Sequence, residues 1–150
     1  MTPNSFKFFL FLFFALFTLV SSSLIYSCSK KEIYFASGDK TFIVENEQLS
    51  WSDGIGRKEL HRTQDLSFHL VRIDTGEKPH VHQKHDLFVI ILKGKGVFFV
   101  GDKKYDMKKG DSVFVQRGTP HYFLARGKGV YAIVIFSPPF DGKDTIEFQR

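Results

Sequence analysis

The sequence has few of the features that build helical, disulfide-bonded or membrane-embedded proteins. After the N-terminal stretch, no segment shows the apolar period of an amphipathic helix. Cys28 is the single cysteine, so an internal disulfide is not possible. Beyond Cys28 there is no second long apolar run. What is left is one soluble globular domain made of strands, preceded by an apolar segment.

The positive charge of the chain is also dispersed. The net charge is +5, and its basic residues fall in short turn-like segments such as "KGK" and "DKK". A nucleic-acid-binding protein would gather such residues on one face or one helix and combine them with aromatic side chains. Neither pattern is present, so we do not expect nucleic acid as a partner.

The N-terminus carries the long apolar run, from Phe8 to Val20, just after Lys7. This run is short for a membrane-spanning helix, which needs about 20 residues, and it suits the apolar region of a signal peptide. The segment "LIYSC", which ends at Cys28, resembles a bacterial lipobox, whose cysteine is acylated. We expect residues 1–27 to be a signal peptide and Cys28 to be the lipidation site. An uncleaved single membrane anchor is the alternative.

A lipid on Cys28 would hold the protein at a membrane outside the cytosol. The predicted location is therefore the periplasm or cell envelope, as an exported lipoprotein. On this interpretation residues 28–45 form a tether, residues 46–140 a barrel domain and residues 141–150 a C-terminal tail.

Short β-rich runs separated by glycine, aspartate and lysine turns make up the domain. This spacing favours an all-β fold, either a sandwich or a small antiparallel barrel, and a small barrel has room at its mouth for one ligand. The expected strands are 66–73, 87–92, 96–100, 104–107, 112–116, 121–125 and 130–136, with 47–51 as a candidate edge strand.

Half of the six histidines lie in the segment "HVHQKHDLF", residues 80–88. On a strand, His80 and His82 share one face, so both imidazoles point into the same space. Buried rings need partners for their nitrogens. A metal ion is one such partner, and a hydrogen-bonded histidine pair is the alternative. His121 follows a "GTP" turn at the start of another strand and would complete a set of three on the barrel wall.

The other histidines are weaker candidates. His61 lies in the polar segment "KELHRTQD" and is expected to be exposed. His69 alternates with Phe68 and Leu70 and therefore faces away from them. Neither histidine is assigned to the site.

The two histidine segments resemble the two motifs of the cupin superfamily. The first reads "GEKPHVHQKHDLFVIILKG", from Gly76 to Gly94, and the second "GDSVFVQRGTPHYFLA", from Gly110 to Ala125. The closing "FSPPFDGKDT", together with "HDL", is similar to a group of small bacterial single-domain cupins. The resemblance implies a small antiparallel jelly-roll barrel, a homodimer, and a divalent transition metal: Fe, Mn, Zn, Ni or Cu.

The resemblance leaves the carboxylate ligand of this metal open. Counting forward from His82 reaches Asp86, whereas counting back from Gly94 reaches Leu87, which cannot bind a metal. A shift of one residue sends a side chain to the other face of a strand. By parity, Phe88, Ile90 and Phe123 are the candidates to point inward, and they would give the metal a largely apolar pocket.

Two ligand sets follow from the two counts. With Asp86 inward, the metal ligands are His80, His82, Asp86 and His121. With Asp86 outward, the site is made of three histidines, and His85 becomes a candidate for a fourth ligand or for a supporting role.

A cupin fold does not name a substrate. The metal site predicts binding of a small molecule, and two functions are open. One is a metalloenzyme of the dioxygenase or isomerase type. The other is an envelope lipoprotein that binds a metal or a small ligand without catalysis. The sequence leaves open whether the protein is an enzyme.

Overall fold

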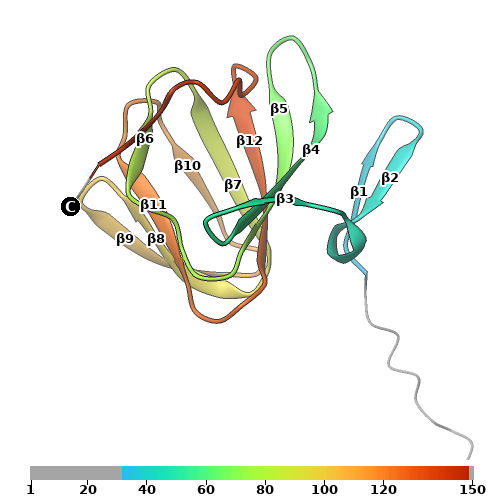
Figure 1. Cartoon of the computed structure of the whole chain (residues 1–150), viewed down its shortest axis with the longest axis horizontal. Helices are drawn as coiled ribbons and strands as arrows, with labels where there is room; N and C mark the ends of the chain where they lie inside the picture. The colour runs from blue at the N-terminus through green and yellow to red at the C-terminus, as the bar shows by residue number, and fades with distance from the viewer. Residues whose placement is uncertain (1–31, 149–150) are drawn as a thin grey trace, which may run out of the picture. The chain divides into compact units, whose positions relative to one another are not determined.

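The computed structural model describes residues 32–148 (Figure 1). The predicted signal peptide and the lipidation site Cys28 lie outside these residues. Within residues 32–148, no helix has the length and apolar character needed to cross a membrane.

The described residues form strands and one short 3-10 helix, η1 (Val44–Asn46). The strands are β1 (Tyr34–Ser37), β2 (Lys40–Ile43), β3 (Ser50–Ser52), β4 (Ile55–Arg62), β5 (Ser67–Ile73), β6 (His80–His82), β7 (Asp86–Lys93), β8 (Lys95–Val100), β9 (Lys103–Lys108), β10 (Ser112–Val115), β11 (His121–Ala125), β12 (Val130–Ser137) and β13 (Thr145–Glu147).

Two antiparallel sheets build the barrel. The larger has the order β10-β7-β12-β5-β4-β3, and the smaller has the order β13-β6-β11-β8-β9. In Figure 1, β6, β11, β8 and β9 form the left wall, and β12, β5 and β4 stand opposite them. The prediction of an all-β antiparallel jelly-roll barrel is confirmed.

The interior of the barrel is filled by alternate residues of the strands. In β7, Leu87, Val89 and Ile91 are buried, and the residues between them are more exposed. Their partners across the barrel include Phe98 and Phe123 of the smaller sheet. Because the side chains of a strand alternate between its faces, this pattern fixes which residues of β7 can reach the pocket.

The outer face of the larger sheet carries a second apolar cluster. Leu70, Tyr131 and Ile133 are buried there, and Phe35 and Phe42 of the β1–β2 hairpin pack against them. This hairpin lies within the range 28–45, which we expected to be a tether. Over its described part, that range is a folded element, because its aromatic side chains cover apolar residues of the sheet.

The C-terminal range also joins the fold. β13 pairs with β6, and its register places Thr145 opposite His82 and Glu147 opposite His80. Residues 141–150 were expected to be a tail, but their described part adds an edge strand beside the two histidines.

Candidate metal centre

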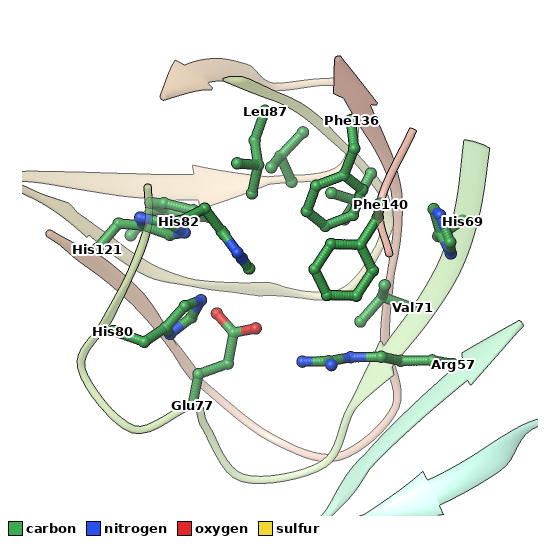
Figure 2. A pocket seen from close by; sticks show the side chains of 13 residues that line it. Arg57, His69, Val71, Glu77, His80, His82, Leu87, His121, Phe136 and Phe140 are labelled. Carbon is green, nitrogen blue, oxygen red and sulfur yellow. The ribbon is translucent and has the colours of Figure 1, made fainter. Parts of the chain in front are cut away.

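Strands β6 and β11 bring three histidines together at one end of the pocket (Figure 2). His80 and His121 are register partners in this antiparallel pair. Each of the three residues His80, His82 and His121 offers a ligand atom, and these atoms all lie within 4.8 Å of one another. All three side chains are buried. The structure brings these three histidines together, as the sequence predicted.

Backbone carbonyls fix the tautomers of two of these rings. Nδ1 of His80 lies 2.8 Å from the carbonyl oxygen of Lys78, and Nδ1 of His121 lies 2.8 Å from that of Thr119. A carbonyl can only accept a hydrogen bond, so both Nδ1 atoms carry the proton. The lone pair of each ring is therefore on Nε2, as a metal ligand requires.

The third ring is oriented by a carboxylate. Nδ1 of His82 lies 3.3 Å from Oδ1 of Asp144, a carboxylate oxygen that only accepts, and 3.3 Å from Oγ1 of Thr145, a hydroxyl that can accept as well. The proton of His82 is thus on Nδ1 as well. All three imidazoles keep the Nε2 lone pair for a shared ligand.

One atom tests whether a metal fits this arrangement. Nε2 of His121 is buried and has no hydrogen-bond partner among residues 32–148. A buried acceptor without a partner costs about 1–3 kcal/mol. A divalent cation held by the three Nε2 atoms would satisfy it, so the donor set fits a divalent transition metal.

Burial also keeps His82 and His121 neutral. Removal from water, with a smaller contribution from neighbouring His80, lowers the pKa of His82 to about 4 and that of His121 to about 3. Neutral imidazole is the form that binds a metal. His82 and His121 are therefore in the metal-binding form at neutral pH.

Asp86 does not join the three histidines. Its Oδ1 accepts the backbone N–H of Arg117 at 2.8 Å, and its Oδ2 accepts from Nη2 of the same residue at 2.6 Å. These hydrogen bonds hold the pKa of the Asp86 carboxyl below its usual range. Asp86 is thus engaged by Arg117 outside the pocket, which corrects the ligand set that includes it.

The count back from Gly94 gives the correct register. Leu87 is 4% exposed and lines the pocket, whereas Phe88 is 38% exposed. Ile90 lies two residues after Phe88 and points to the same outer face of β7. The expectation that Phe88 and Ile90 line the pocket was therefore wrong. Phe123, which was also expected inward, is buried in the core.

His85 contributes from behind the site. Its Nδ1 donates to Oδ2 of Asp144 at 2.6 Å, and its Nε2 lies 3.3 Å from the carbonyl oxygen of Pro139. Asp144 also accepts the backbone N–H of Lys84 at 2.9 Å. Burial opposes ionisation of Asp144, but these hydrogen bonds outweigh it and lower the pKa of its carboxyl.

His82, His85 and Asp144 form a second group whose ligand atoms lie within 4.8 Å of one another. The hydrogen bonds just described already join these atoms. We call this group the supporting cluster. Its carboxylate, Asp144, orients the His82 ring through Nδ1, as carboxylates outside the ligand set orient metal-binding histidines.

The pocket beside the histidines is small and mostly apolar. Its volume of about 50 Å³ has room for roughly three water molecules. The rings of Phe136 and Phe140 stack at 4.5 Å between their centroids and form one wall (Figure 2). The full lining is Arg57, His69, Val71, Glu77, His80, His82, Leu87, Val89, Phe98, His121, Val134, Phe136 and Phe140.

Sequence reasoning missed three polar residues of this lining. Two hydrogen bonds join Glu77 to Phe123. The N–H of Phe123 donates to Oε2 of Glu77 at 3.0 Å, and the N–H of Glu77 donates to the carbonyl of Phe123 at 2.8 Å. Arg57 extends from β4 toward the Glu77 carboxylate (Figure 2). His69 is joined to Oγ of Ser67 at 2.9 Å, and burial lowers its pKa to about 4.

Comparison with known proteins agrees with the fold and with the motifs. The cupin domain family matches residues 69–137. An uncharacterised protein of Aquifex aeolicus is 37% identical over 91 residues, which cover 61% of this chain and 75% of the relative.

Solved structures give the same result. KdgF from Halomonas sp. has a TM-score of 0.61 and 28% identity, covering 67% of this chain and 95% of its own. Oxalate decarboxylase from Bacillus subtilis has a TM-score of 0.62 over 71% of this chain and 31% of its own; at 18% identity it shows the fold alone. With its two histidine motifs on the paired strands β6 and β11 of a jelly-roll barrel, this chain contains a cupin domain over residues 69–137.

Proposed function

We propose that this protein binds a divalent transition metal through His80, His82 and His121 and uses it to hold a small molecule inside the barrel. The observation that carries the proposal is the buried Nε2 of His121, which has no partner within residues 32–148. Three imidazole ligands leave coordination positions open, and Fe, Mn, Zn, Ni and Cu all accept such ligands.

A bound metal of this kind polarises an oxygen of its ligand or lowers the pKa of a bound water. The residues around it favour chemistry on a small molecule. Glu77 places a carboxylate in the pocket, and one of its oxygens is held by Phe123 while the other receives no hydrogen bond from residues 32–148. This oxygen can take a proton from a bound molecule. The apolar wall of Phe136 and Phe140 excludes water from the transfer.

A metalloenzyme is therefore our first candidate. Glu77 suits a reaction with a proton transfer, such as an isomerisation, and a dioxygenase is the other type that such a metal supports. The second candidate is a non-catalytic protein that binds a metal or a small ligand. It is favoured by Leu87, an apolar residue at the inward position of β7 where a carboxylate ligand would stand.

We also propose that the protein is exported and held at a membrane by a lipid on Cys28. The apolar run from Phe8 to Val20 and the lipobox-like "LIYSC" support this. Replacing Cys28 with alanine should move the protein from the membrane fraction to the soluble fraction. Retention of the Cys28→Ala variant in membranes would favour the uncleaved anchor. A homodimer is proposed by the family resemblance, and sedimentation equilibrium tests it.

Elemental analysis tests the metal site. The full chain is purified in a non-ionic detergent without added metal, then reconstituted with each of the five metals in turn. We expect close to one metal per chain in the parent and a large loss in His82→Ala. A parent that contains no metal and accepts none would overturn the metalloenzyme and the metal-binding form of the second candidate.

The two candidates are separated in a further step. Turnover of small hydroxy acids and ketones is followed by proton NMR in deuterated buffer, together with oxygen uptake. Exchange or turnover that is lost in Glu77→Gln, with metal content unchanged, supports the enzyme. Metal-dependent binding without turnover or exchange supports the binding protein.

A further inference from the structure

The guanidinium of Arg57 differs from those of the other arginines in the described part of the chain. Arg62 pairs with Glu59, Arg72 with Asp74, Arg117 with Asp86 and Arg126 with Asp106. Arg57 has no ion pair within residues 32–148, yet it is the arginine that lines the pocket. From this we infer that Arg57 anchors a small carboxylate, whose other end reaches the three histidines. The inference rests on the proposed function and names its ligand class.

The position of Arg57 supports this role. Figure 2 shows its side chain entering from β4, across the pocket from His121. Glu77 lies between Arg57 and His80 in this view, but its carboxylate is more than the ion-pair distance from the guanidinium, and it is fastened to Phe123 instead. The guanidinium therefore keeps its paired N–H donors for a ligand, and a planar carboxylate accepts two of them at once.

The charges of the pocket favour an anion once a metal is bound. The divalent cation and Arg57 are positive, and Glu77 and Asp144 are negative, so the sum stays positive. The wall around them is apolar, including Val71, Val134 and Phe140. Arg57 itself is exposed, so solvent screens part of its attraction to an anion, and the paired geometry of its donors provides the selectivity.

The size of the pocket selects among anions. A volume of about 50 Å³ admits a ligand of only a few non-hydrogen atoms. A phosphate group would need donors for four oxygens and balance for about two negative charges, and Arg57 is the only cationic side chain in the lining. A carboxylate with one further oxygen two or three bonds away is small enough for this volume, and Arg57 can balance its single negative charge.

The experiment compares glycolate with glycolamide, which share a hydroxyl and differ in the charged group. Both are titrated by calorimetry into the full chain in non-ionic detergent, once loaded with Zn²⁺ and once after chelation. We expect glycolate to bind the zinc-loaded protein at least about tenfold more tightly than glycolamide, since a hydrogen bond to a charged group contributes about 1.5–3 kcal/mol.

Variants then assign the preference to Arg57. Arg57→Gln should reduce glycolate affinity by about 10–100-fold and leave glycolamide within about twofold. Arg57→Lys should keep a preference for glycolate but bind it more weakly, because an ammonium cannot present two parallel donors. Arg126→Gln removes the same charge at the surface, where Arg126 pairs with Asp106, and should change neither affinity.

The outcomes distinguish failure of the carboxylate inference from failure of the proposed metal site. Zinc content and thermal melting are measured on the same samples. If zinc binds and the glycolate affinity of a folded Arg57→Gln or Arg57→Lys equals that of the parent, the carboxylate inference fails while the metal site stands. Binding of inorganic phosphate as tight as that of glycolate also overturns it. If the parent protein takes up no zinc, the proposed metal-binding function itself is overturned.

Discussion

Two histidine clusters meet at His82, and they differ in how their nitrogens are used. In the cluster of His80, His82 and His121, each Nδ1 has an acceptor, and one ligand atom from each ring lies within 4.8 Å of the other two. In the supporting cluster both nitrogens of His85 already have acceptors, Asp144 on one side and Pro139 on the other.

The difference shows that crowding alone does not identify a metal ligand. Both clusters are buried, and both satisfy the same distance limit between ligand atoms. Hydrogen-bond satisfaction separates them, because both nitrogens of His85 already lie against protein acceptors, whereas Nε2 of His121 has no partner among residues 32–148. We therefore assign the first cluster to the ligand site and the second to the structure that orients it.

The largest expected effect comes from breaking the first cluster. His121→Ala removes the fully buried ring nitrogen that has no partner in the described residues. Metal affinity should fall by more than the roughly 10–100-fold that loss of an outer hydrogen-bond partner causes. Competition with a chromogenic chelator measures it. His61→Ala, at an exposed histidine bonded to Ser37, is the control and should leave the affinity unchanged. Equal affinities of the two variants would contradict the assignment.

Breaking the supporting cluster should give a smaller loss of metal and a larger loss of stability. Asp144→Asn weakens the acceptor of His82 and of His85, so metal affinity should fall about 10–100-fold. The free energy of unfolding of the metal-free protein should fall by about 1–3 kcal/mol, because the neutral amide accepts the N–H groups of Lys84, His82 and His85 more weakly than the buried carboxylate does. Chelator competition and urea denaturation measure the two effects.

The control for this variant lies in the same loop. Asp141 is exposed, and its carboxylate accepts only the N–H of Lys143 among the described residues. Asp141→Asn should change neither quantity. Parent-like metal affinity in Asp144→Asn would mean that the supporting cluster does not orient His82.

His69 extends the comparison to a neutral histidine outside both clusters. Burial lowers its pKa to about 4 in the folded protein, against an unfolded value near 6.5. Between these two values the unfolded chain binds more protons than the folded one. The stabilisation is therefore present above about pH 6.5 and is lost as the pH falls toward 4.

We expect the metal-free protein to lose stability over this interval, with His69 accounting for about 2–3 kcal/mol. His69→Gln should show a shallower loss between pH 7 and pH 4.5 in urea denaturation. Identical pH dependence in parent and variant would show that His69 is not held neutral by the fold. His61→Gln, at the exposed histidine, should keep the dependence of the parent.

The sequence predicted much of this fold because its strands alternate. The runs that became β5, β7, β8 and β12 carry apolar residues that fill the barrel, and the two-residue spacing placed His80 and His82 on one face. β4 was missed because "IGRKELHR" is mostly polar, with two of its eight residues buried. Arg57 was missed with it.

The other missed residues have a different cause. Glu77 lies in the loop before β6, where no period operates, and only its bonds to Phe123 bring it into the pocket. Asp144 is distant in sequence from His82 and His85, so no spacing rule connects them. The one available signal was the resemblance of "FSPPFDGKDT" together with "HDL" to a group of small cupins.

The register of β7 explains why Asp86 and Leu87 were hard to separate. Residues 83–85 form a bend between β6 and β7, so alternation counted from His82 does not continue to Asp86. The count back from Gly94 enters β7 without crossing that bend, and it gives the observed orientation.

Asp86→Asn is the smallest expected change and the sharpest test of that register, because it repeats the chemistry of Asp144→Asn at the other acidic candidate. Asp86 is held by Arg117, whose side chain is 50% exposed, and a pair at the surface contributes little. The free energy of unfolding should fall by no more than about 1 kcal/mol, and metal affinity should stay within about twofold. A loss of metal comparable to that of Asp144→Asn would return Asp86 to the ligand set.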